Sequence, residues 1–236
     1  MDTRCWGFSA WKLLHSITFG YPVRPTRKDQ TIYYHFFSSI KNVLPCIFCR
    51  NSFDQFEKEL PLKDHLDSRD SLVTWLYLMH NKVNDKLRKC GEHDEPDAEL
   101  DDVKNFYSKY VRTLNNSQSR LNVPGWDFIY CVIFDFPVKK PDAARTAGII
   151  VFFQLLQAVL PFHSFRNYYT DYISLHPIKD VLNNKQAFKR WFYNLEKGYC
   201  VQRQLEYRSY SETCKYIDQF KADCSIKNGK PICRAP

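Results

Sequence analysis

Glycine is scarce in this chain, and long apolar runs are missing. Only 7 of the 236 residues are glycine, which argues against a glycine-rich β architecture. The longest apolar candidate, residues 148–160, is interrupted by Gln154 and Gln157 and is too short to span a bilayer. The N-terminus has no apolar signal core, so we expect a soluble protein that no classical signal exports.

What is present favours packed, apolar helical cores. Hydrophobic residues make up 44% of the chain and aromatic residues 16%, enough for one large or two small domains. The net charge of +8 is uneven, because residues 185–236 hold 11 Lys and Arg against 5 Asp and Glu. Such a basic tail is typical of a solvated surface, and an acidic protein is an alternative partner. We do not expect nucleic acid as a partner.

The nine cysteines include one Cys-x-x-Cys pair, Cys46 and Cys49. An odd number means that at least one thiol is free or pairs between chains. The pair alone is compatible with a zinc half-site, a dithiol redox centre or coincidence. Pro45 suits the first turn of a helix, which would place both sulfurs at the positive end of the peptide dipoles and favour thiolate. The pattern therefore indicates a redox-active site.

Two flanking segments carry polar and aromatic side chains at helical spacing. Trp11 and His15 are four residues apart and share one helix face. Residues 75–89 contain no Gly or Pro and predict one long helix, on which His80 and Asn84 share a face. Aromatic rings, imidazoles, amides and ammonium groups suit a flat heterocycle that carries a diphosphate.

In this order the motifs resemble the Erv/ALR family of FAD-linked sulfhydryl oxidases. The family pattern runs Trp-x-x-x-His, Tyr-Pro, Pro-Cys-x-x-Cys, Trp and His-Asn-x-Val-Asn-x-x-Leu-x-Lys, and residues 7–89 match it. Two positions depart from it: Gly-Arg is Gly7-Phe8 here, and a structural cysteine is replaced by Tyr77. Members from large cytoplasmic DNA viruses of the mimivirus type are similarly sparse in structural bridges, and the chain is most similar to them.

The resemblance implies an enzyme, a thiol oxidase that forms disulfides in protein or small dithiols. Cys46 would exchange with substrate, and Cys49 would lie beside the flavin, with O₂ as the final acceptor and H₂O₂ as the product. No metal takes part. The residues implied in FAD binding are Gly7, Trp11, His15, Tyr21, Cys49, His80, Asn81, Val83, Asn84, Lys86 and Lys89.

Two other functions and one mechanistic question stay open. The function alternatives are a zinc module using Cys46, Cys49, Cys90 and His93, and a non-catalytic basic helical adaptor. Many family members relay electrons through a second, mobile cysteine pair. No second Cys-x-x-Cys exists, so direct attack on Cys46 is equally open. The cysteines available for a relay are Cys5, Cys90, Cys131, Cys200, Cys214, Cys224 and Cys233.

The second half repeats the first at a nearly constant offset of 115 or 116 residues. Trp126 to Pro137 mirrors Trp11 to Pro22, and Trp191 mirrors Trp75, which indicates duplication. The chemistry is lost in the copy. Replacements at the site positions are Phe162 for Cys46, Phe165 for Cys49, Tyr130 for His15, Glu196 for His80, Lys197 for Asn81 and Cys200 for Asn84.

We therefore predict an all-α fold with two helical bundles packed as an internal pseudo-dimer. Residues 1–112 form the Erv/ALR domain, and residues 113–236 form a degenerate copy without cofactor, followed by the basic tail. The resemblance also implies a cytoplasmic protein at a viral assembly site or in the virion, and leaves a further homodimer open. Helices are expected near residues 9–20, 28–43, 46–58, 69–88, 124–135, 144–159, 162–174 and 185–197.

Overall fold

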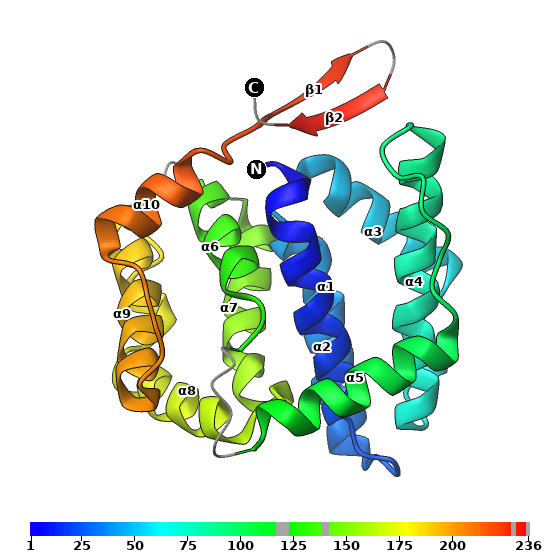
Figure 1. The fold of residues 1–236 in the computed structure, drawn as a ribbon, viewed down its shortest axis with the longest axis horizontal. Coiled ribbons are helices and arrows are strands. Elements are labelled where there is room, and N and C mark those ends of the chain that lie inside the picture. Colours follow the sequence, from blue (N-terminus) through cyan, green and yellow to red (C-terminus); the bar gives the residue numbers. More distant parts are fainter. Residues whose placement is uncertain (117–122, 138–141, 228–229, 235–236) are drawn as a thin grey trace.

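Helices make up almost all of the computed structural model, which describes residues 1–116, 123–137, 142–227 and 230–234 (Figure 1). The first half contains α1 (Thr3–Gly20), α2 (Arg27–Val43), α3 (Ile47–Glu59), a 3₁₀ turn (Leu62–His65), α4 (Arg69–Lys89) and α5 (Leu100–Leu114). The second half contains α6 (Trp126–Asp135), α7 (Ala143–Val159), α8 (His163–Leu175), a 3₁₀ turn (Ile178–Asp180) and α9 (Lys185–Arg203). The all-α prediction is confirmed for both halves.

The predicted helices are present, with two boundary differences. The first helix begins at Thr3 rather than near residue 9, because Asp2 caps it by accepting a hydrogen bond from the Arg4 backbone N–H. The last of the eight continues to Arg203. The extended Tyr21 ends α1 just before Pro22, as the Tyr-Pro motif predicts.

Besides α5 and the 3₁₀ turns, three elements lie outside the eight predicted ranges. Helix α10 (Tyr210–Asp218) is followed by an antiparallel hairpin of β1 (Asp223–Lys227) and β2 (Lys230–Arg234). Residues 228 and 229 of its turn lie outside the described residues. The hairpin lies beside the N-terminus, and β2 packs against α1 and α3 (Figure 1).

Equivalent helices of the two halves pack against each other. Helix α2 packs on α7, and α1 packs on α6, its own counterpart in the repeat. The rings of Phe36 and Phe152, which occupy equivalent positions, stack with centroids 5.3 Å apart. Contact between a position and its own counterpart is what a twofold interface produces.

Gly148 allows α2 and α7 to approach closely. A Cβ atom at this position would lie 2.4 Å from Cβ of Asn42 on the facing helix, nearer than two carbon atoms can pack. Around it lies a core of aromatic rings in edge-to-face contact that includes Phe37, Phe153 and Trp75, all at most 1% exposed. The interface between the halves is therefore as tightly packed as either interior.

Corresponding hydrogen bonds occur in both halves. Trp75 Nε1 donates to the carbonyl of Leu60 at 3.0 Å, and Trp191 Nε1 donates to the carbonyl of His176 at 2.8 Å. Both donor and acceptor positions are related by the same offset of 116 residues. In each bundle, a tryptophan of the fourth helix, α4 or α9, thus donates a hydrogen bond to the residue that ends the third helix.

Helix α5 crosses the first bundle and packs on α1 and α4. It ends at Leu114, so the expected domain boundary at residue 112 falls inside its last turn. None of the helices within the described ranges has both the length and the apolar character required to cross a membrane.

Candidate redox site and adjoining cavity

Cys46 and Cys49 are joined as a disulfide at the start of α3, with Cα atoms 5.2 Å apart. Cys46 is the N-cap of this helix, and its Sγ accepts a hydrogen bond from the Cys49 backbone N–H at 3.2 Å. Pro45 precedes the cap and lies two positions before Ile47, so it is outside the first turn in which the sequence suggested it. The sulfur still lies at the positive end of the helix dipole, which favours its thiolate after reduction.

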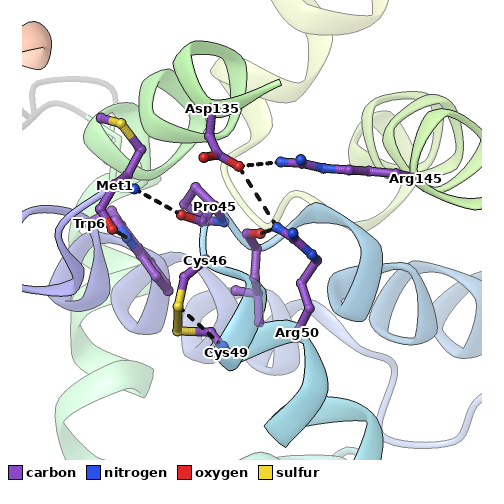
Figure 2. A network of polar contacts seen from close by, with 9 residues as sticks. Met1, Trp6, Pro45, Cys46, Cys49, Arg50, Asp135 and Arg145 are labelled. Carbon is purple, nitrogen blue, oxygen red and sulfur yellow. Dashed lines mark hydrogen bonds and ion pairs between the residues drawn. A yellow bond between two sulfur atoms is a disulfide. The ribbon is translucent and has the colours of Figure 1, made fainter. Parts of the chain in front are cut away.

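Contacts from distant parts of the chain hold this helix start (Figure 2). The N-terminal amine of Met1 donates to the Pro45 carbonyl at 3.3 Å. Arg50 donates to the Leu44 carbonyl at 2.7 Å and lies 3.8 Å from a carboxylate oxygen of Asp135, at the end of α6. Asp135 also pairs with Arg145 of α7. The second half is thus tied directly to the helix that carries the disulfide.

A cavity of about 440 Å³ adjoins the disulfide in the first half. Helix α1 contributes one wall, α4 another, and Cys49 on α3 a third. The lining is mainly apolar side chains, with a few polar groups at the edges. Its residues are Thr3, Arg4, Trp6, Gly7, Phe8, Ala10, Trp11, Leu14, Ile40, Leu44, Cys49, Ser52, Phe53, His80, Val83, Asn84, Lys86, Leu87, Glu92 and His93.

Stacked rings form part of this wall. Trp11 and His80 stack with centroids 3.9 Å apart, and His15 Nε2 lies 3.1 Å from His80 Nδ1. Tyr107 of α5 stacks on the other side of His15 at 4.8 Å. The Trp-x-x-x-His motif and the long-helix histidine therefore meet, as the shared-face argument requires.

Both imidazoles are held neutral. Burial, followed by the neighbouring His80, lowers the pKa of His15 from 6.5 to about 3. Burial also lowers the pKa of His80 to about 4, although the Asp97 carboxylate partly opposes it. Neutral rings share one N–H between the two facing nitrogens, and which nitrogen carries it depends on the tautomer.

Two polar groups of α4 have partners at the cavity edge. The Asn84 amide donates to Asp97 at 2.8 Å, and Arg88 holds the same carboxylate. Lys86 Nζ donates to Ser52 Oγ at 2.6 Å, and burial lowers the pKa of this ammonium group. Ser52 and Lys86 also line a second cavity of about 430 Å³, where Lys89 lies.

The structure brings together most, but not all, of the residues expected to bind a cofactor. Those lining the main cavity are Gly7, Trp11, Cys49, His80, Val83, Asn84 and Lys86. His15 lies behind His80, and Lys89 lines only the neighbouring cavity. Asn81 lines neither. Tyr21 is buried with its hydroxyl donating to the Leu66 carbonyl at 2.7 Å, which is a packing role.

The disulfide differs in one respect from the expected arrangement. Cys49 lines the cavity as expected, but Cys46, expected to face the substrate, is only 2% exposed. Met1 covers its helix end, and β2 lies against α3. Attack by a substrate thiol therefore requires Cys46 to become more exposed than it is in this arrangement.

The zinc alternative finds no support. Cys46 and Cys49 are bonded to each other, and within the described ranges no three His, Cys, Asp or Glu side chains gather closely enough to hold a metal.

Several residues that line the cavity are not part of the family motif. Thr3 and Arg4 come from the first turn of α1, and Glu92 and His93 come from the turn after α4. The Nε2 atom of His93 is buried without a hydrogen-bond partner in the described structure. Only the tertiary fold brings these segments to the cavity, and the sequence carries no spacing signal for them.

In the second half, aromatic side chains pack around the position that corresponds to Cys49. Phe165, at the position of Cys49, packs on Trp126 with centroids 5.1 Å apart and on Tyr199 at 4.9 Å. Tyr130 donates a hydrogen bond to Glu196, so the positions of His15 and His80 are in contact here as well.

The sequence model of the Erv1 / Alr family matches residues 8–105, which hold the cavity and the disulfide. The chain contains an Erv/ALR family domain. This Erv domain takes in the whole motif from Trp11 to Lys89.

Curated relatives align to the same region. A probable FAD-linked sulfhydryl oxidase of Acanthamoeba polyphaga mimivirus is 41% identical over 85 residues, 36% of this chain and 59% of the relative. The mitochondrial FAD-linked sulfhydryl oxidase ERV1 of Saccharomyces cerevisiae is 35% identical over 88 residues, 37% of this chain and 46% of the relative. The chain thus spans about half the length of these relatives.

A solved structure is also similar in sequence. The crystal structure of the yeast Erv1 core is 31% identical, with 47% of this chain and 83% of that chain covered, and a TM-score of 0.39.

Proposed function

We propose that the protein is an FAD-dependent sulfhydryl oxidase that forms disulfides in dithiol substrates and uses O₂ as acceptor. The observation that supports it best is the position of the Cys46–Cys49 disulfide. Its inner sulfur, Cys49, forms part of the wall of a mainly apolar cavity inside an Erv domain.

The cavity residues fit FAD. An apolar cavity with a few placed polar groups is typical of a cofactor site, and the Trp11 and His80 rings supply a flat wall. The unpartnered Nε2 of His93 offers a polar contact to a ligand, and the Lys86 ammonium suits an anionic phosphate. When bound, FAD accepts two electrons from the dithiol and passes them to O₂, giving H₂O₂.

The chain's own part begins at Cys46. A substrate thiolate attacks Cys46 Sγ, forms a mixed disulfide and releases Cys49 as a thiolate against the cavity. The second substrate thiol then attacks its partner sulfur in the mixed disulfide, which forms the substrate disulfide and releases Cys46. The N–H of Cys49 points at Cys46 Sγ, so the released thiolate is stabilised by a hydrogen bond and the helix dipole.

The C-terminal hairpin is our candidate for an electron relay to Cys46. Strand β2 lies against α3, and the Cα atoms of Cys224 and Cys233 are partners in the hairpin register. Replacing both with alanine should slow oxidation of a protein dithiol much more than oxidation of dithiothreitol. The Cys214→Ala variant is the control. An equal effect on both substrates would rule out a relay through this pair.

We further propose that residues 113–236 are a degenerate copy of the Erv domain that binds no flavin. The stacked Phe36 and Phe152 and the two equivalent tryptophan hydrogen bonds support a common origin. Phe165 takes the place of Cys49 and packs on Trp126. Trp126 and Glu196 line a cavity of about 540 Å³, but the residues that line it include no cysteine to pass electrons to a ring.

Oxygen consumption with dithiothreitol tests the oxidase. The purified chain should absorb at about 450 nm and consume oxygen, and Cys46→Ala and Cys49→Ala should each lose activity. Cys46→Ala leaves a thiolate at Cys49 against the flavin and should show a long-wavelength absorbance band, which Cys49→Ala should lack. A colourless chain that FAD cannot reconstitute would leave the non-catalytic adaptor as the better account.

A further inference from the structure

Two thiols face each other where the halves meet. Cys5 lies in the first turns of α1 and Cys131 lies in the middle of α6, and their Sγ atoms are 3.8 Å apart. They are 126 residues apart in the sequence, and neither belongs to the family motif. Neither takes part in the proposed oxidase mechanism.

Their surroundings hold the two thiols in place. The adjacent Trp6 packs on Phe128 across the same helix pair, with centroids 5.9 Å apart. Cys131 is fully buried, whereas Cys5 is partly exposed. A disulfide bond is about 2.05 Å long, so the sulfurs need to close by about 1.8 Å for the bond to form.

We propose that Cys5 and Cys131 form a disulfide that covalently joins the two halves of the protein. The partly exposed Cys5 thiolate first attacks a small disulfide such as oxidised glutathione, forming a mixed disulfide and releasing one glutathione thiolate. The Cys131 thiolate then attacks Cys5 Sγ, which forms the Cys5–Cys131 bond and releases the second glutathione. Two thiols are oxidised and one small disulfide is reduced.

Burial slows the second step but does not prevent it. The hydrogen bond with Cys5 and burial raise the pKa of Cys131, so little thiolate is present at neutral pH. The facing sulfur in the mixed disulfide compensates, because the attack is intramolecular and already aligned. Formation should therefore take minutes to hours rather than seconds.

The bond would stabilise the arrangement of the halves. Joining positions 126 residues apart closes a long loop in the unfolded chain, which is where a disulfide has its largest effect. Helix α1 also lines the main cavity through Thr3, Arg4 and Trp6. Fixing its first turns to α6 would hold that wall in position whether or not a flavin is bound.

Peptide mapping of the full chain tests the bond directly. The protein is incubated with oxidised glutathione, remaining thiols are alkylated, and peptides are analysed without reduction. We expect a peptide that links Cys5 to Cys131, with the Cys46–Cys49 link unchanged. Recovery of Cys5 only as a free thiol or a glutathione adduct, in folded protein, would overturn the proposal.

Thermal unfolding provides the second measurement, since a reductant also opens Cys46–Cys49. The Cys5→Ser variant reports that background loss, and Cys214→Ser on α10 is the matched control for removing a partly exposed thiol. Oxidised wild type and Cys214→Ser should each unfold roughly 5–10 °C higher than their reduced forms beyond the difference seen in Cys5→Ser. An equal oxidised-minus-reduced difference in all three would refute a stabilising bond.

Discussion

At the scale of single residues, burial keeps the two histidines of the site in their neutral form. His15 and His80 share a hydrogen bond while neutral, and the same positions in the second half hold a tyrosine hydroxyl that donates to a carboxyl. Burial raises the pKa of Glu196, in keeping with a hydrogen-bonded pair that carries little charge. Each half thus has a hydrogen bond between its first and fourth helices: α1 to α4 through two imidazoles, and α6 to α9 through a hydroxyl and a carboxyl group.

The depressed pKa of His15 makes stability depend on pH. The pKa of about 3 in the folded protein lies below the ordinary histidine pKa of 6.5, so the unfolded chain binds more protons between these limits. This contribution is fully present above pH 6.5 and is lost as the pH falls towards 3. In His15→Gln the fall in unfolding free energy should be shallower than in wild type by up to about 1.4 kcal/mol per pH unit.

Urea unfolding of both proteins between pH 7 and pH 4.5 measures the two slopes. The exposed His35 is the control, because His35→Gln removes an imidazole from the surface of α2. Parallel curves for His15→Gln and wild type would show that His15 is not held neutral by the fold.

At the scale of helices, replacing glycine by alanine separates two effects on stability: the higher helix propensity of alanine and the steric clash at a close helix contact. Alanine normally stabilises a helix interior by about 1 kcal/mol relative to glycine. At Gly148 the added Cβ would meet Asn42, whereas at Gly7 it would meet nothing within 4 Å. We expect Gly148→Ala to lower the free energy of unfolding by about 1–3 kcal/mol and Gly7→Ala to raise it slightly.

Chemical denaturation of the two variants makes this comparison. Because the substitution is the same and both sites are helical, the difference between them isolates the contact of α7 with α2. A stabilising Gly148→Ala would mean that the two helices are not held at this separation in solution.

The helices were predictable from sequence because their signals are local. Tyr21-Pro22 ends α1, and the Gly- and Pro-free stretch from Trp75 to Lys89 is one helix. The hairpin was not predicted, although Asn228-Gly229 between two short segments is a common hairpin turn signal.

The cavity was predictable only in part, and the reason is tertiary. Spacing places Trp11 with His15 on one face of α1 and His80 with Asn84 on one face of α4, but only the fold brings Trp11 against His80. The turn after α4 folds back through Asp97 and Arg88, which brings His93 to the cavity. Cys46 is buried at a helix start that the N-terminal amine of Met1 contacts, a contact that local sequence does not predict.

At the scale of the whole molecule, an ion pair from Asp135 connects the second half to α3, the helix that begins at the disulfide. Asp135 lies between Arg50 on α3 and Arg145 on α7, and all three side chains are at most 26% exposed (Figure 2). Asp135→Asn leaves two guanidinium groups facing each other without a countercharge. We expect a loss of about 1–2 kcal/mol in unfolding free energy and faster hydrogen exchange over residues 47–52.

Asp54→Asn is the matched control, since Asp54 forms ion pairs with Lys41 and Lys58 on the more exposed side of α3. Its effect should stay within about 0.5 kcal/mol. Similar exchange rates over residues 47–52 in both variants would show that the second half does not anchor this helix.

The number of flavins per chain tests whether only the first half binds the cofactor. The first half has a cavity beside a disulfide, whereas in the second half Phe165 replaces Cys49 and packs on Trp126 and Tyr199. Flavin released by acid should therefore equal one per chain. His80→Ala should lower this ratio by removing a ring that stacks on Trp11, and Glu196→Gln, at the equivalent position, should leave it at one. A ratio near two, or equal losses in the two variants, would mean that the second half still binds cofactor and that the duplication kept its chemistry.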